Sequence, residues 1–142
     1  MKLSTRSRYG TRALVELGAH CGDGPVRLEA LAENEGIAVR YLAAIVRDLM
    51  RAGLVRSVRG AHGGYLLARD PADVRLADVV RYLEGSLEPV ECLNDPGFCD
   101  RREGCVTREV WGKVGDAIEG VLGSITLKDL IDRRAEKDGR HK

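Results

Sequence analysis

Aromatic side chains and long hydrophobic runs are both scarce in this chain of 142 residues, and each shortage excludes a class of protein. Only 4% of the residues are Phe, Trp or Tyr, so we do not expect a platform of rings that stacks on single-stranded nucleic acid. No segment approaches the roughly 18 apolar residues that a membrane span needs. The basic start of the chain is not followed by an apolar stretch, so we expect no secretory signal, no membrane partner and a cytoplasmic location.

Catalytic signatures are also missing from the sequence. The three histidines, His20, His62 and His141, are scattered, and no nucleophile has a base at a usable spacing. Neither a zinc-protease motif nor a phosphate-binding loop is present. We therefore expect that the protein is not an enzyme.

The composition that remains is that of a folded domain with an uneven charge. Hydrophobic residues make up 44% and charged residues 32% of the chain, which is enough for a core. Residues 1–60 carry ten Lys or Arg against six Asp or Glu, whereas residues 61–142 carry thirteen against sixteen. This asymmetry favours a polyanionic partner for the first part of the chain alone.

Short helical patterns follow one another in the first fifty residues. Ser4 or Thr5 caps a first predicted helix that ends near residue 19, and two further helices are predicted over residues 28–34 and 39–51. Gly36 lies in the tight corner between these two and suits a positive φ. Two helices joined by such a corner form a helix-turn-helix, whose second helix enters the major groove of DNA.

A glycine-rich hairpin comes directly after this pattern. Residues 54–58 and 65–67 have strand character, and the tip between them contains Gly60, Gly63 and Gly64. A phosphate-cradling loop would need a helix after the glycines, and a strand follows instead. We interpret the hairpin as the wing of a winged helix, whose arginines can reach the minor groove. The residues expected at DNA are Arg40, Tyr41, Arg47, Arg56, Arg59, Gly60, His62 and Gly63.

The rest of the chain predicts a short helix, a long loop and a long helix. The short helix covers residues 76–84, and about twenty loop residues separate it from a helix over residues 106–122. The apolar stripe of the long helix consists of Val106, Val110, Val114, Ile118, Val121 and Ile125. Its glycines cost about 1 kcal/mol each, so it must be packed. We expect it to pack on its counterpart in a homodimer and on the first helix of its own chain, and we expect the charged tail from residue 132 to fray.

Together these patterns predict a mainly α fold with a small β-hairpin, in which a winged helix-turn-helix precedes a long dimerisation helix. We divide the chain into a DNA-binding domain over residues 1–84, a cysteine loop over residues 85–105, and a dimerisation helix with its tail over residues 106–142. The expected partners are a double-stranded DNA operator and a second copy of the chain.

Three of the four cysteines, Cys92, Cys99 and Cys105, lie in or at the end of the long loop. Disulfides are disfavoured in the cytosol, so these thiols are free to converge on one metal centre. Structural zinc sites use more closely spaced cysteine pairs, and the wide spacing here favours an iron–sulfur cluster. Zinc, redox-active thiols and the absence of a special role remain alternatives. Cys21, at the end of the first helix, is expected to be a small core residue.

Several of these motifs resemble one family. The wing motif from Arg59 to Leu67, the three downstream cysteines, the segment from Ser124 to Leu127 and the opening from Leu3 to Tyr9 are similar to the Rrf2 family of bacterial winged-helix regulators, which includes iron–sulfur regulators and nitric-oxide sensors. The resemblance covers nearly the whole chain. It implies a dimeric transcriptional regulator, expected to be a repressor, that binds palindromic operators. It also implies a 2Fe–2S or 4Fe–4S cluster on the three loop cysteines and one further ligand, with operator affinity set by the cluster.

The chain departs from the family pattern at the fourth ligand. Some members have a histidine where this chain has Arg108, and others take a carboxylate from the first helix of the partner, where this chain has Ser7, Arg8 and Tyr9. The fourth ligand is therefore unassigned. Its candidates are Asp95, Asp100 and Glu103 in the loop and, with less support, His20 and His62. The alternative function is a cluster-free regulator of the same fold that uses thiol redox chemistry, zinc or a partner protein as its signal.

Overall fold

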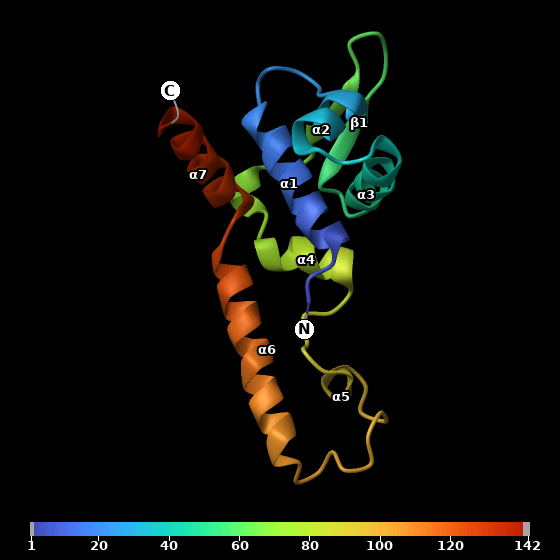
Figure 1. The fold of residues 1–142 in the computed structure, drawn as a ribbon, viewed down its shortest axis with the longest axis vertical. Coiled ribbons are helices and arrows are strands. Elements are labelled where there is room, and N and C mark those ends of the chain that lie inside the picture. The colour runs from blue at the N-terminus through green and yellow to red at the C-terminus, as the bar shows by residue number, and fades with distance from the viewer. Residues whose placement is uncertain (1, 141–142) are drawn as a thin grey trace.

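The computed structural model describes residues 2–140 and confirms the predicted fold class, with a mainly helical chain and one antiparallel hairpin (Figure 1). The elements in chain order are α1 (Thr5–Ala19), α2 (Leu28–Glu35), α3 (Val39–Arg51), β1 (Val55–Val58), β2 (Gly64–Leu67), the 3₁₀ turn η1 (Pro71–Asp73), α4 (Leu76–Glu84), α5 (Glu91–Asn94), α6 (Val106–Ser124) and α7 (Leu127–Arg140). Within the described range, no helix is both long enough and apolar enough to cross a bilayer.

The core forms where the apolar stripes of α1, α2 and α3 meet. Its fully buried side chains include Leu14 of α1, Leu31 of α2 and Leu42, Ile45 and Leu49 of α3. The corner between α2 and α3 is made as the sequence predicts, because Gly36 adopts the left-handed conformation with φ 65°. The packing of these three helices fixes the direction of α3, whose opposite face stays in solvent.

The hairpin is a two-stranded sheet that is extended by one bridge. β1 pairs with β2 from Val55–Leu67 to Val58–Gly64, and an isolated bridge joins Val26 to Tyr65. The chain before α2 therefore lies along the outer edge of the hairpin and ties the wing to the helix-turn-helix.

The last two helices differ from the expectation. α6 packs mainly on α4, where Ile118 and Leu122 contact the buried pair Ala77 and Val80. The position that we expected α6 to take along α1 is occupied by α7. Gly18 of α1 allows this approach, because a Cβ atom there would overlap the side chain of Ile131. The charged tail is thus not frayed up to residue 140, and residues 141–142 lie outside the described part of the chain.

A buried carboxylate joins α1 to α7. Glu16 is only 1% exposed, and it accepts hydrogen bonds from His20 (2.8 Å) and Asn34 (2.9 Å) and forms an ion pair with Arg134. Burial alone would raise the pKa of Glu16, but the hydrogen bonds from Arg134, His20 and Asn34 outweigh burial and lower it. The ion pair, together with the packing of Leu127 and Ile131, ties the tail helix to the core.

We expect Arg134→Met to destabilise the protein by about 2–4 kcal/mol, because it leaves a buried carboxylate without its cation. The matched control Arg133→Met removes an exposed arginine of the same helix and is expected to change stability by less than about 0.5 kcal/mol. Urea unfolding followed by circular dichroism measures both.

The same pair makes a pH-dependent contribution. Since the pKa of Glu16 is lowered in the folded state, its contribution is present above the pKa of the unfolded chain and is lost as the pH falls. Arg134→Met should therefore flatten the acid side of the stability curve, and an unchanged acid side would contradict the assigned role of the pair.

Candidate nucleic-acid interface and cysteine loop

The outer face of α3 presents the side chains that the sequence placed at DNA. Arg40 and Arg47 are exposed, and neither forms an ion pair within residues 2–140. Tyr41 is 36% exposed, but its hydroxyl lies 2.6 Å from that of Thr5 and its ring meets Tyr9 edge-on at 5.9 Å. Tyr41 therefore holds α3 against α1, and its role at DNA stays a prediction.

A second contact between α1 and α3 was not found from the sequence. Asp48 of α3 forms ion pairs with Arg6 at the start of α1 and, at 3.4 Å, with Arg51. Arg6 and Asp48 are 42 residues apart, so no local spacing could reveal the pair. The contact anchors the C-terminal part of α3, while Arg40 near its N-terminus forms no ion pair among the described residues.

The wing has the glycines that its geometry requires. Gly60 has φ 112°, and a Cβ atom on Gly63 would collide with the carbonyl of Val58. Arg56, Arg59 and His62 are exposed around this tip, and Gly63 is half-buried beneath it. The tip projects from one end of the molecule (Figure 1), as a segment that enters a groove must.

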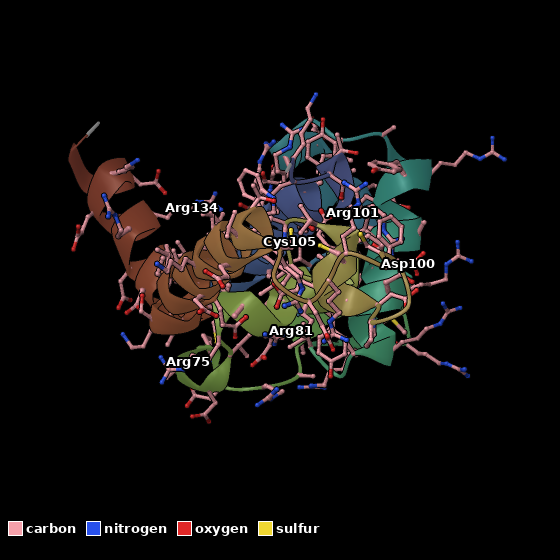
Figure 2. All side chains as sticks on the ribbon, turned by 90° about the horizontal axis from the view of Figure 1, so that it is seen from below. Arg75, Arg81, Asp100, Arg101, Cys105 and Arg134 are labelled. Carbon is pink, nitrogen blue, oxygen red and sulfur yellow. The ribbon has the colours of Figure 1, made fainter. Side chains whose placement is uncertain are left out.

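The cysteine loop lies at the other end of the molecule, between α4 and α6 (Figure 1). Cys92 lies in the short α5 and is half-buried, Cys99 is exposed, and the half-buried Cys105 caps the N-terminus of α6. Figure 2 views this end and labels Cys105 together with Asp100 and Arg101 of the loop. Cys21 is exposed, so its expected place in the core was wrong.

The structure does not bring the three loop cysteines together. Among the described residues, no group of three or more His, Cys, Asp and Glu side chains is close enough to hold a metal ion. The oxygen Oδ1 of Asp95 accepts a hydrogen bond from the amide of Gly97 at 2.9 Å, and His20 is paired with Glu16. Asp100 and Glu103 are exposed, and His62 lies on the distant wing.

The chemistry of the donor set nevertheless fits a soft metal centre. All three thiols are free, and the loop that carries them contains only one turn of helix. The pKa of Cys105 is lowered by the hydroxyl of Thr107, which lies 3.3 Å from the sulfur, by the amide of Arg108 and by the charge of Arg108. A thiolate is the form that binds metals and reacts with oxidants.

Comparison with known proteins gives a consistent family. The sequence model of the Rrf2 family, described as an iron-dependent transcriptional regulator, matches residues 3–133. The protein rrf2 of Nitratidesulfovibrio vulgaris is 44% identical over 131 residues, which are 92% of this chain and 87% of that relative.

Solved structures of two regulators superimpose closely on the chain. CymR, the global cysteine regulator of B. subtilis, has a TM-score of 0.82 and 38% identity over 94% of this chain and 98% of its own. IscR of T. potens has a TM-score of 0.80 and 42% identity over 96% of this chain and 90% of its own. The family match over residues 3–133 includes the wing, the cysteine loop, α6 and the first part of α7.

The environment of Cys105 generates a test in the metal-free protein. We expect the pH midpoint for alkylation of Cys105 by iodoacetamide to rise in Thr107→Val, because the change removes the hydroxyl that favours the thiolate. Thr11→Val, a change in α1, should leave the midpoint where it is in the parent chain. Peptide mass spectrometry over a pH series measures the rate at this one cysteine, and equal midpoints in all three proteins would refute the effect.

Proposed function

The chain belongs to the Rrf2 family of transcriptional regulators, and we propose that it binds operator DNA as a homodimer whose affinity is set by an iron–sulfur cluster on Cys92, Cys99 and Cys105. The arrangement of α3 and the wing carries the DNA-binding part of the proposal. Both present exposed arginines without ion pairs among the described residues, so these side chains bind phosphates without first breaking a contact.

The outer face of α6 supports the homodimer. Val106, Val110, Val114 and Val121 are 39–71% exposed, whereas Gly115 is buried against Glu88 and Pro89 of the loop. Ile118 of the predicted stripe packs on α4 instead, and the four valines that remain form an exposed apolar surface that favours association. A second copy of α6 supplies a self-complementary surface and places two reading helices on one operator.

The cofactor part of the proposal rests on the donor set. Cys92, Cys99 and Cys105 would hold the cluster, which supplies a redox-sensitive and labile centre when bound. The residues of the chain supply the rest of the site. Thr107 and the amide of Arg108 stabilise the Cys105 thiolate, and the loop leaves the sulfurs reachable from solvent. No fourth ligand is assigned.

A second function is favoured by a specific observation. The three thiols are not gathered, and the superposition on CymR, a cysteine regulator by its description, is as close as that on IscR. A cluster-free regulator of the same fold would use the Cys105 thiol, whose pKa Thr107 and Arg108 lower, for redox chemistry, or would respond to zinc or a partner protein.

Arg59→Ala tests the wing. We expect the dissociation constant for a palindromic duplex, selected by the parent protein from a random library, to rise roughly tenfold, and the salt dependence to fall by about one counterion, because one groove or phosphate contact is lost. Arg133→Ala changes the charge equally on α7 and should bind as the parent does. Unchanged affinity of Arg59→Ala in fluorescence anisotropy would remove the wing from the interface.

Val114→Asp tests the dimer. A carboxylate in the exposed apolar stripe should shift the protein to monomer in sedimentation equilibrium, because burying it in the interface would need a partner that the stripe lacks. Gly112→Asp is the matched control, since a Cβ atom at Gly112 meets nothing within 4 Å and the helix period places Gly112 on the side of α6 opposite Val110, Val114 and Val121. A parent chain that is already monomeric at micromolar concentration would contradict the proposed homodimer.

The cofactor is tested by purifying the protein without oxygen. We expect visible absorption bands together with iron and sulfide for the parent chain, and neither for the variant in which Cys92, Cys99 and Cys105 are serine. Colourless parent protein that binds zinc stoichiometrically, or no metal at all, would refute the cluster in favour of the second function.

A further inference from the structure

The carboxylate of Glu84, at the C-terminal end of α4, is hydrogen-bonded to the start of α1. The oxygen Oε1 of Glu84 accepts hydrogen bonds from the amide of Ser4 at 2.7 Å, the hydroxyl of Ser4 at 2.6 Å and the hydroxyl of Ser7 at 2.5 Å. Ser7 is 2% exposed, so its hydroxyl depends on this acceptor. Three donors on one oxygen fix the place and direction of the start of α1.

The same turn of α1 holds α3. Thr5 contacts the hydroxyl of Tyr41, and the neighbouring Arg6 is paired with Asp48. Tyr41 lies near the N-terminus of α3 and Asp48 near its C-terminus, so α3 is held towards both ends by the turn of α1 that Glu84 contacts.

A packing contact runs beside these polar contacts. A Cβ atom on Gly10 would lie 2.6 Å from Cδ1 of Leu83 and 3.3 Å from Cγ2 of Ile45, so the glycine lets α4 and α3 approach α1 from two sides. Leu83 is the residue before Glu84. A shift at the end of α4 would thus reach α3 through apolar contact as well as through hydrogen bonds.

Glu84 is also the last residue before the cysteine loop. Gly85 follows with φ 98° and turns the chain into the segment that carries Cys92, Cys99 and Cys105. Figure 1 shows the start of α1 against α4, with the short segment before α1 running towards the loop, whereas the wing lies at the far end. The helix end that Glu84 occupies is therefore directly continuous with the loop.

We propose that Glu84 is a positioning residue that sets the place of α3 through Ser4 and Ser7 and so transmits the state of the cysteine loop to the DNA-reading helix. The transmission rests on the proposed function, because it needs a loop whose state changes. The placement of α3 by Glu84 does not depend on the proposed function. If Glu84 had only a structural role, its substitution would lower the stability of the protein but leave the response of DNA binding to the loop unchanged.

Hydrogen exchange tests the positioning role without DNA or cofactor. Glu84→Gln removes the charge of the acceptor, and Ser7→Ala removes one of its donors. Glu136→Gln makes the same charge change as Glu84→Gln, but on the exposed face of α7. We expect amides in residues 4–8 and 39–48 to exchange at least threefold faster in the first two variants than in the control. If α3 exchanges as in the parent chain in both variants, the positioning role is overturned.

Operator affinity tests the transmission. Two proteins are compared on the library-selected duplex: the variant with serine at positions 92, 99 and 105, and the chain with its three loop cysteines after treatment with iron and sulfide in the absence of oxygen. We define R as the dissociation constant of the first divided by that of the second. When Ser7, Glu84 and Glu136 are unchanged, we expect the two dissociation constants to differ roughly 10- to 100-fold, with either one the larger. Glu84→Gln and Ser7→Ala should bring R at least fivefold closer to 1, and Glu136→Gln should not change it.

The outcomes separate this inference from the function on which it rests. Faster exchange in α3 with an unchanged R would overturn the transmission and leave Glu84 as a positioning residue alone. An R of 1 in the parent background would contradict the proposed cofactor control and the transmission together, while the exchange experiment still decides the positioning role.

Discussion

The buried ion pair between Glu16 and Arg134 is the contact on which the arrangement of the whole chain depends. It brings α7 back onto α1, and the bridge between Arg75 and Thr126 brings the start of α7 beside the start of α4. The C-terminal end of α6 is thereby fixed to the winged-helix core. The rest of α6 extends away from the core and presents an apolar face to solvent. A charge buried at this point tolerates no alternative position of α7, because the carboxylate would then lack its cation.

This arrangement separates α3 and the wing from the loop that carries the thiols. The wing and the cysteine loop lie at opposite ends of the molecule, so the loop cysteines lie away from the proposed DNA interface. Control of DNA binding then requires an element that links the two regions. α1 packs on α3 and on α4, the helix that leads into the cysteine loop, and its two core glycines, Gly10 and Gly18, let α4 and α7 approach closely. The same helix that completes the core is therefore placed to couple the two ends.

The elements with strong local patterns were predicted from the sequence, and the long-range contacts were not. The apolar spacing in α1 to α4 and the glycines of the corner and wing define those elements within a residue or two. α7 was missed because it is rich in charge and packs through only a few apolar residues such as Leu127 and Ile131. Glu16 and Glu84 act on partners 118 and 77–80 residues away in sequence, which no periodicity reveals. For the site, the sequence predicted which thiols share a loop, but a loop without regular structure does not determine how close they come.

The central claim is that the three loop thiols control how the regulator holds DNA. The most direct measurement follows transcription from a promoter that the protein occupies, in cells that are starved of iron and then resupplied. Cells carry either the parent chain or the form with serine at positions 92, 99 and 105, at equal protein levels. The account predicts a promoter that responds to iron with the parent chain and stays at one level with the serine form. An equal response with both chains would contradict it.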